Sequence, residues 1–128
     1  MLNINKLTDY ALILLCEIND FQVISANELS NLTKIPLATT NKILKKLNKS
    51  NICKSIKGKN GGFLLNKPHN SISIYDVIIS IEDNKLSFTD CANHNCNLIG
   101  HCKITKKMNI IDKEIYNIIS NKFISDLF

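Results

Sequence analysis

The fold is decided by residues 25–66, which read SANELSNLTKIPLATTNKILKKLNKSNICKSIKGKNGGFLLN. At the start of this stretch, Ser25 stands three residues before Glu28. This is the spacing of a capping box, in which the hydroxyl and the carboxylate satisfy backbone N–H groups at the beginning of a helix. The pattern predicts a short helix that ends near Leu32.

A second helix is predicted to begin around Pro36, because proline fits the first turn of a helix, where its missing N–H is harmless. The apolar residues that follow have helical spacing and form one buried stripe in a helix that reaches about Ser50: Ile43, Leu44 and Leu47. Two short helices around a tight turn form a helix-turn-helix. In this motif the second helix lies in the major groove of DNA, with its N-terminal residues at the base edges.

Two short strands are predicted next, at residues 52–56 and 63–66. They are separated by Lys57-Gly58-Lys59-Asn60-Gly61-Gly62, in which the glycines permit the positive φ angles of a hairpin. A basic hairpin directly after a helix-turn-helix is typical of a wing, which reaches an adjacent groove or the phosphates while the helix reads the major groove. An ordinary surface hairpin is the plainer interpretation of the same residues.

Charge is distributed unevenly along the chain, whose formal net charge is +5. Between Glu28 and Asp76 there is no acidic residue, and nine lysines give this segment a charge of +9: Lys34, Lys42, Lys45, Lys46, Lys49, Lys54, Lys57, Lys59 and Lys67. A surface that binds a polyanion needs positive charge without carboxylates among it. Each lysine that neutralises a phosphate releases counterions from the nucleic acid, and this release favours binding. Although a run of lysines is often only a solvated face, we expect double-stranded nucleic acid as the partner.

Apolar spacing predicts three further helices. The first covers residues 8–19, with Thr8 as its N-cap. Ser73 and Asp76 form a capping box at the head of a helix over residues 74–82. In the last helix the apolar residues alternate in spacings of four and three, as in paired helices: Ile104, Met108, Ile111, Ile115 and Ile118. This pattern favours a homodimer, although a core helix within one chain could have the same stripe.

Length and composition restrict the class of protein. The 128 residues suit one domain, and a hydrophobic content of 45% is enough to build a core. No stretch approaches the roughly 20 apolar residues of a membrane span, and the N-terminus lacks the pattern of a secretion signal, so a cytoplasmic protein without a membrane partner is expected. Because no nucleophile motif and no phosphate-binding glycine loop occur, we expect neither an enzyme nor a small-molecule substrate.

Five cysteines carry the remaining chemistry. In a reducing compartment an odd number does not suggest a disulfide framework, and Cys16 and Cys53 stand inside apolar patterns, as core residues do. The other three lie within twelve residues: Cys91, Cys96 and Cys102. Three thiolates in one loop favour an iron–sulfur cluster. Zinc is the second choice, with His94 and His101 as possible further ligands, and free surface thiols are the third.

The order of these features resembles that of the Rrf-type transcriptional regulators, the family of IscR and NsrR. The similarity covers nearly the whole chain: the opening segment 6–11, the two helices, the wing 57–63, the helix start 72–78, the three cysteines, and a dimer helix that ends at residues 124–127. The N-terminal segment and the short C-terminus are most similar to the regulators of the SUF iron–sulfur assembly genes. The resemblance implies a homodimer in which three cysteines per chain hold a 2Fe–2S or 4Fe–4S cluster, and in which the cluster decides whether operator DNA is bound, usually to repress.

The resemblance also bears on the remaining cluster ligand. Some family members use a histidine three residues after the last cysteine, where this chain has Thr105. Others use an acidic residue near the N-terminus of the partner subunit, and Asp9 stands at that position. Asp9 is therefore the first candidate, with His94 or His101 behind it. An ordinary role is equally open to Asp9, because the helix dipole favours a carboxylate in the first turn of a helix.

The same resemblance places base-reading residues in the second helix, where Asn41 suits adenine and Lys42 suits guanine or phosphate. Relatives often have a minor-groove arginine in the wing, where this chain has Lys57. All sixteen basic residues are in fact lysine, so readout by the wing should be weaker and more purely electrostatic. The expected DNA-binding set is Ala38, Thr39, Asn41, Lys42, Lys45, Lys57, Lys59 and Asn60.

We therefore predict a mainly α (α+β) fold in three parts: a winged helix-turn-helix domain over residues 1–82, a cysteine-rich cluster-binding loop over 83–102, and a dimerisation helix and tail over 103–128. The predicted function is iron–sulfur-cluster-sensing regulation of transcription, as a repressor of SUF-type assembly genes. A nitric-oxide-sensing or redox-sensing repressor of the same family, and a zinc-based or thiol-based DNA-binding protein, are the alternatives.

Overall fold

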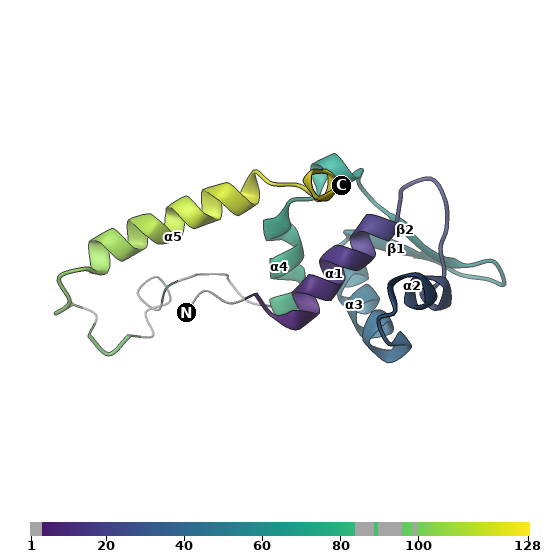
Figure 1. The fold of residues 1–128 in the computed structure, drawn as a ribbon, viewed down its shortest axis with the longest axis horizontal. Coiled ribbons are helices and arrows are strands. Elements are labelled where there is room, and N and C mark those ends of the chain that lie inside the picture. Colours follow the sequence, from purple (N-terminus) through teal and green to yellow (C-terminus); the bar gives the residue numbers. More distant parts are fainter. Residues whose placement is uncertain (1–3, 84–88, 90–95, 99) are drawn as a thin grey trace.

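The computed structural model describes residues 4–83, 89, 96–98 and 100–128. These residues form, in chain order, α1 (Lys6–Glu17), α2 (Ala26–Thr33), α3 (Leu37–Lys49), β1 (Cys53–Ile56), β2 (Gly62–Leu65), the 3-10 helix η1 (His69–Ser71), α4 (Ile74–Glu82), α5 (Thr105–Ser120) and the 3-10 helix η2 (Ile124–Leu127). The predicted mainly α fold with a small antiparallel sheet is confirmed (Figure 1). Within the described ranges, none of the helices combines the length and the apolar content needed to cross a lipid bilayer.

The core lies where α1, α3 and α4 pack together. Each of these helices has one apolar face, which in α3 is the predicted stripe of Ile43, Leu44 and Leu47. The buried apolar side chains of the three helices are Ala11, Leu14, Leu15, Ile18, Ile43, Leu44, Leu47, Val77, Ile78 and Ile81. Full burial of one such side chain is worth about 1.5–3 kcal/mol. Figure 1 shows α1 to α4 and the hairpin gathered in one body, whereas α5 extends away from it.

Helix α1 begins earlier than predicted. Its N-cap is Asn5, whose side-chain oxygen accepts a hydrogen bond from the backbone N–H of Leu7 at 3.0 Å. Thr8, the predicted N-cap, lies inside the helix and is fully buried. The prediction of Thr8 was wrong because asparagine caps a helix as well as threonine does, and a start at Asn5 brings Leu7 and Thr8 against the core.

The helix-turn-helix forms as predicted. Ser25 caps α2, because its hydroxyl accepts a hydrogen bond from the backbone N–H of Glu28 at 3.1 Å. This is one half of the predicted capping box, whose return bond from the N–H of Ser25 to the Glu28 carboxylate does not form among the described residues. In the turn that follows, Lys34 has a left-handed backbone with a φ of 64°. The Ser30 hydroxyl donates to the carbonyl oxygen of Ile35 at 2.7 Å, across the turn. Pro36 is the N-cap of α3, one position before the first helical turn.

The predicted hairpin also forms, with antiparallel pairing that sets Cys53 opposite Leu65. A bridge between Ile24 and Phe63 ties the hairpin to the segment before α2. This bridge requires glycine at position 62, because a Cβ at Gly62 would lie 2.3 Å from the carbonyl oxygen of Ile24. The hairpin is therefore fixed to the helical body along one side.

Helix α4 has the predicted bounds and the predicted capping box. The Ser73 hydroxyl accepts a hydrogen bond from the N–H of Asp76, and the Asp76 carboxylate accepts one from the N–H of Ser73. Two backbone N–H groups at the helix start are satisfied in this way. The direction of α4, which leads toward the cysteine segment, is thus fixed at its first turn.

The end of the chain returns to the body instead of continuing the dimer helix, which the resemblance extended to residues 124–127. The N–H of Ile124 donates to the carbonyl oxygen of Ile72 at 3.0 Å, and the N–H of Ile74 donates to that of Lys122 at 2.8 Å. Ile124 is fully buried. Helix α5 is therefore held, beyond its last residue, against the start of α4.

Replacing Ile124 with alanine tests whether the C-terminal segment belongs to the core. Because the side chain is fully buried, we expect the free energy of unfolding to fall by about 2–4 kcal/mol. Leu127→Ala is the control, since Leu127 belongs to the same short helix but is half exposed, and its loss should stay below about 1 kcal/mol. Urea unfolding measures both variants. Equal losses would contradict this packing of the C-terminal segment.

Candidate DNA interface and cysteine segment

Helix α3 has one buried and one exposed face. Its inner residues are Thr40, Ile43, Leu44 and Leu47. The exposed residues recur at spacings of three and four, which places them along one face: Ala38, Asn41, Lys42, Lys45 and Lys49. Of the DNA contacts predicted on this helix, only Thr39 is half buried instead of exposed. The structure thus gives α3 the outward polar face that a recognition helix needs.

The wing residues predicted to contact DNA, Lys57, Lys59 and Asn60, are all exposed. They lie in the hairpin loop that projects beyond the helical body (Figure 1). The N–H of Gly61 donates to the carbonyl oxygen of Gly58 at 3.1 Å and closes this loop. Gly58 has a φ of 117°, a conformation that favours glycine. The wing therefore presents its lysines at the end of a defined turn.

Eight of the nine lysines in the basic segment are exposed, and Lys46 is the exception. Its Nζ donates to the carbonyl oxygen of Ile81 at 3.1 Å and to the carboxylate of Asp83 at 2.5 Å. The hydrogen bond from Lys46 and the lysine's charge lower the pKa of Asp83. From the sequence, Lys46 was grouped with the other lysines, because a lysine that contacts a neighbouring helix cannot be recognised from the spacing of residues in its own helix.

Two of the five cysteines are core residues, as predicted. Cys53 is buried in β1, and burial raises the pKa of its thiol to about 12. Cys16 packs half-buried against the core, and burial, with a smaller contribution from Glu17, raises its pKa as well. Because the thiolate is the form that binds metals and attacks electrophiles, both residues are poor candidates for reactive chemistry near neutral pH.

Two of the predicted cluster ligands, Cys96 and Cys102, are free and half-buried. Cys102 stands three residues before the start of α5, and its carbonyl oxygen accepts a hydrogen bond from the Thr105 hydroxyl at 3.3 Å. His101 is exposed. Cys91 and His94 lie outside the described residues. Within the described ranges, no three histidine, cysteine, aspartate or glutamate side chains are grouped so that they could hold a metal ion.

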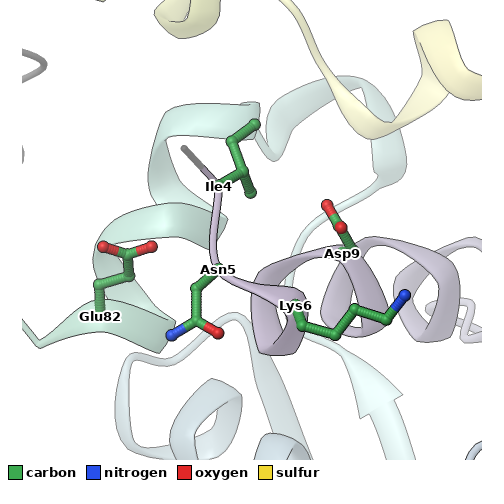
Figure 2. Close-up of a pocket in the computed structure, with 5 residues that line it drawn as sticks. All are labelled: Ile4, Asn5, Lys6, Asp9 and Glu82. Atoms are coloured by element: carbon green, nitrogen blue, oxygen red, sulfur yellow. The ribbon is translucent and has the colours of Figure 1, made fainter. Parts of the chain in front are cut away.

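Asp9 is exposed in the first turn of α1 and lines a polar hollow of about 580 Å³ together with Ile4, Asn5, Lys6 and Glu82 (Figure 2). Figure 2 shows the carboxylates of Asp9 and Glu82 on either side of the Ile4–Asn5 segment, and the Lys6 side chain pointing away from Glu82. Glu82 is the last residue of α4. The hollow therefore lies close to the point where the chain leaves α4 toward the cysteines.

Comparison with known proteins agrees with this picture. The model of the Rrf2 family, described as iron-dependent transcriptional regulators, matches residues 4–128. The HTH-type transcriptional regulator YffB of Lactococcus lactis is 32% identical over 119 residues, which cover 88% of this chain and 76% of YffB. Two solved structures support the fold. CymR, the global cysteine regulator of B. subtilis, has a TM-score of 0.79 at 18% identity, covering 99% of this chain and 96% of CymR. IscR of T. potens has a TM-score of 0.67 at 17% identity, covering 98% and 85%.

The exposed lysines can be tested through the salt dependence of DNA binding. Each phosphate contact contributes about −0.9 to the slope of log affinity against log salt concentration. We therefore expect Lys42→Gln and Lys57→Gln each to reduce the magnitude of the slope by about 1 on a duplex of arbitrary sequence. Lys113→Gln, which removes an exposed lysine of α5, should leave the slope unchanged. Fluorescence anisotropy over a salt series measures the slopes, and the same slope in all three variants would argue against this interface.

Proposed function

The chain belongs to the Rrf2 family of transcriptional regulators, and from this premise we propose that it is an iron–sulfur-cluster-sensing repressor of SUF-type iron–sulfur assembly genes. Its class is that of a DNA-binding regulator, not an enzyme. The observation that carries the finer proposal is the set of three cysteines, Cys91, Cys96 and Cys102, between the DNA-binding body and α5. As a regulator of genes, the protein is proposed to work in the cytoplasm.

Recognition of operator DNA is assigned to α3 and the wing. Asn41 and Lys42 lie on the exposed face in the N-terminal half of α3, which is the part of a recognition helix that meets the base edges. Their side chains suit adenine and guanine. Lys57 and Lys59 in the wing are compact hydrated charges, so they contribute affinity through phosphates more than discrimination between sequences.

A homodimer through α5 is supported by the exposure of its apolar side chains. None of the 16 residues of α5, all of which the structure describes, is buried. Ile104 is 57% exposed, Ile111 42% and Ile118 60%. Exposed apolar side chains that recur along one helix indicate an interface, and a helix of this length gains its stability from packing. Met108 and Ile115, which lie between them in the predicted stripe, are half-buried. A second copy of α5 would cover the stripe and place two α3 helices in register with two operator half-sites.

The donor set between the two parts fits an iron–sulfur cluster. Cys96 and Cys102 are free and half-buried, in contrast to the buried thiol of Cys53, and thiolates are the usual ligands of such clusters. Cys91 would be the third ligand. Once bound, the cluster supplies a redox-responsive centre whose loss or damage changes the chain around it. Asp9 of a second copy is proposed as the remaining ligand, because it is exposed beside the end of α4.

Two other functions would use the same residues. A nitric-oxide-sensing or redox-sensing repressor would share the cluster, and a zinc-based or thiol-based regulator would share the cysteines. The similarity in fold to CymR, whose description is that of a cysteine regulator, is the observation that favours a thiol-based function. Metal content and the visible spectrum distinguish these functions from the one proposed.

Anaerobic purification tests the cluster directly. We expect a coloured protein that contains iron and acid-labile sulfide and that differs from its metal-free form in affinity for its own upstream DNA, as measured by footprinting. Cys102→Ser should lose the colour, whereas Cys16→Ser should keep it, because Cys16 packs against the core. A colourless protein with stoichiometric zinc, and with DNA binding that is independent of metal, would refute the proposal.

The dimer is tested by placing a charge in the apolar stripe of α5. Ile111→Glu would bury an unpaired carboxylate from each copy, so we expect the dimer dissociation constant to rise by at least about 30-fold. Asn117→Glu adds the same charge at an exposed polar position of the helix and should have little effect. Sedimentation velocity over a concentration series measures both. Unchanged association of Ile111→Glu would exclude this face as the interface.

A further inference from the structure

Lys46 connects α3 to the far end of α4. Its Nζ lies 3.1 Å from the carbonyl oxygen of Ile81 and 2.5 Å from the carboxylate of Asp83. The Lys46 side chain is 23% exposed and that of Asp83 is 64% exposed. The partners lie 35 and 37 residues away in sequence, so this contact depends on the folded arrangement of the two helices.

The chemistry of the helix end explains the contact. Helix α4 ends at Glu82, so the carbonyl of Ile81 lies in the last turn, where carbonyl groups lack a partner within the helix. The ammonium of Lys46 satisfies this carbonyl and complements the negative end of the helix dipole. Asp83 is the C-cap, with a left-handed backbone (φ 54°) that aspartate tolerates better than most residues. Lys46 therefore holds both the last turn and the cap.

The contact of Lys46 lies where the cysteine segment begins. The segment with Cys91, Cys96 and Cys102 begins directly after Asp83. On α3, Lys46 stands between the exposed Lys45 and the buried Leu47, on the flank that meets α4. One side chain thus joins the helix assigned to DNA reading to the residue from which the cysteine segment departs.

We propose that Lys46 is a positioning residue, which transmits the state of the cysteine segment to α3 through Ile81 and Asp83. This inference rests on the proposed function. A change in the cysteine segment strains or relaxes the C-terminal turn of α4, and the Lys46 contacts carry that change to the orientation of α3. Lys46 itself does not contact DNA, in contrast to Lys45 one residue before it.

Three variants separate these roles. Lys46→Met keeps the aliphatic stem without the charge, and Asp83→Asn keeps a residue that accepts the left-handed cap. Lys45→Met removes the same charge from the exposed face. On a duplex of arbitrary sequence, Lys45→Met should reduce the magnitude of the salt slope by about 1, and Lys46→Met should leave the slope unchanged.

The second measurement is the ratio of affinities for the protein's own upstream DNA between the anaerobically reconstituted and the metal-free protein. Lys46→Met and Asp83→Asn should each bring this ratio about two- to fivefold closer to one, the range that a partly exposed ion pair supports. The double variant should change the ratio no further than Lys46→Met alone, because Lys46→Met already removes the contacts with both Ile81 and Asp83. Lys45→Met should weaken binding in both states and keep the ratio.

A third measurement does not need the cluster. In metal-free protein, hydrogen exchange at the last residues of α4 should be faster in Lys46→Met and Asp83→Asn than in Lys45→Met. Three results would each overturn this inference and leave the proposed function standing. They are a lower salt slope for Lys46→Met, an affinity ratio that stays as in the unmodified protein in both variants, and unchanged hydrogen exchange at the end of α4. If the unmodified protein bound DNA equally well in both states, the proposed function would fail, and this inference with it.

Discussion

The packing of α3 against α1 and α4 is the constraint on which the rest of the molecule depends. Ile43, Leu44 and Leu47 have no exposed surface, so rotation of the helix would return apolar side chains to water at a cost of about 1.5–3 kcal/mol each. This fixed inner face determines which residues point outward. It also sets the position of α4, which is both a wall of the core and the start of the path to the cysteines.

The two ends of the molecule are stabilised differently. The DNA-binding body is complete within one chain, because its helices bury their apolar faces on one another and its hairpin is tied to the segment before α2. The contacts of helix α5 with α4 include the aromatic pair Tyr75 and Tyr116, whose ring centroids are 4.7 Å apart, and α5 keeps Ile110, Ile111 and Ile118 exposed. The exposed face of α3 is therefore preorganised in each chain, whereas α5 keeps apolar surface in contact with water.

Local signals in the sequence were sufficient for most of the fold. The Ser73–Asp76 capping box and the apolar spacing predicted α4 to the residue, and the glycines between the strands predicted the wing. Thr8 was chosen wrongly as a cap although Asn5, three residues earlier, is the better capping residue, because the apolar spacing alone did not fix where the helix begins. The apolar spacing also identified the buried stripe of α3 and the two core cysteines, whereas the outward residues of α3 were expected from the resemblance.

What could not be predicted depends on contacts between distant residues. The roles of Lys46 and Ile124 follow from where the ends of α4 lie in space, and neither residue interrupts a local pattern. The ligands of the proposed cluster are hard to predict for the same reason, because Asp9 does not meet Cys96 and Cys102 within the described part of one chain. The residue types indicate that thiolates take part. They do not tell which side chains, from which chain of the proposed dimer, surround the cluster.

The return of the chain to the start of α4 has a consequence for how this architecture can change over time. The Ser73–Phe123 bridge brings the segment after α5 back to the residue that caps α4, so the stretch between Asp83 and Phe123 is an excursion that leaves from the end of α4 and returns to its start. The entropy cost of closing such a loop grows only slowly with its length. The excursion could therefore gain or lose residues, or carry a different set of ligands, and the core and α3 would stay intact. The excursion is thus an exchangeable cassette on a self-contained body, with the end of α4 as its point of departure.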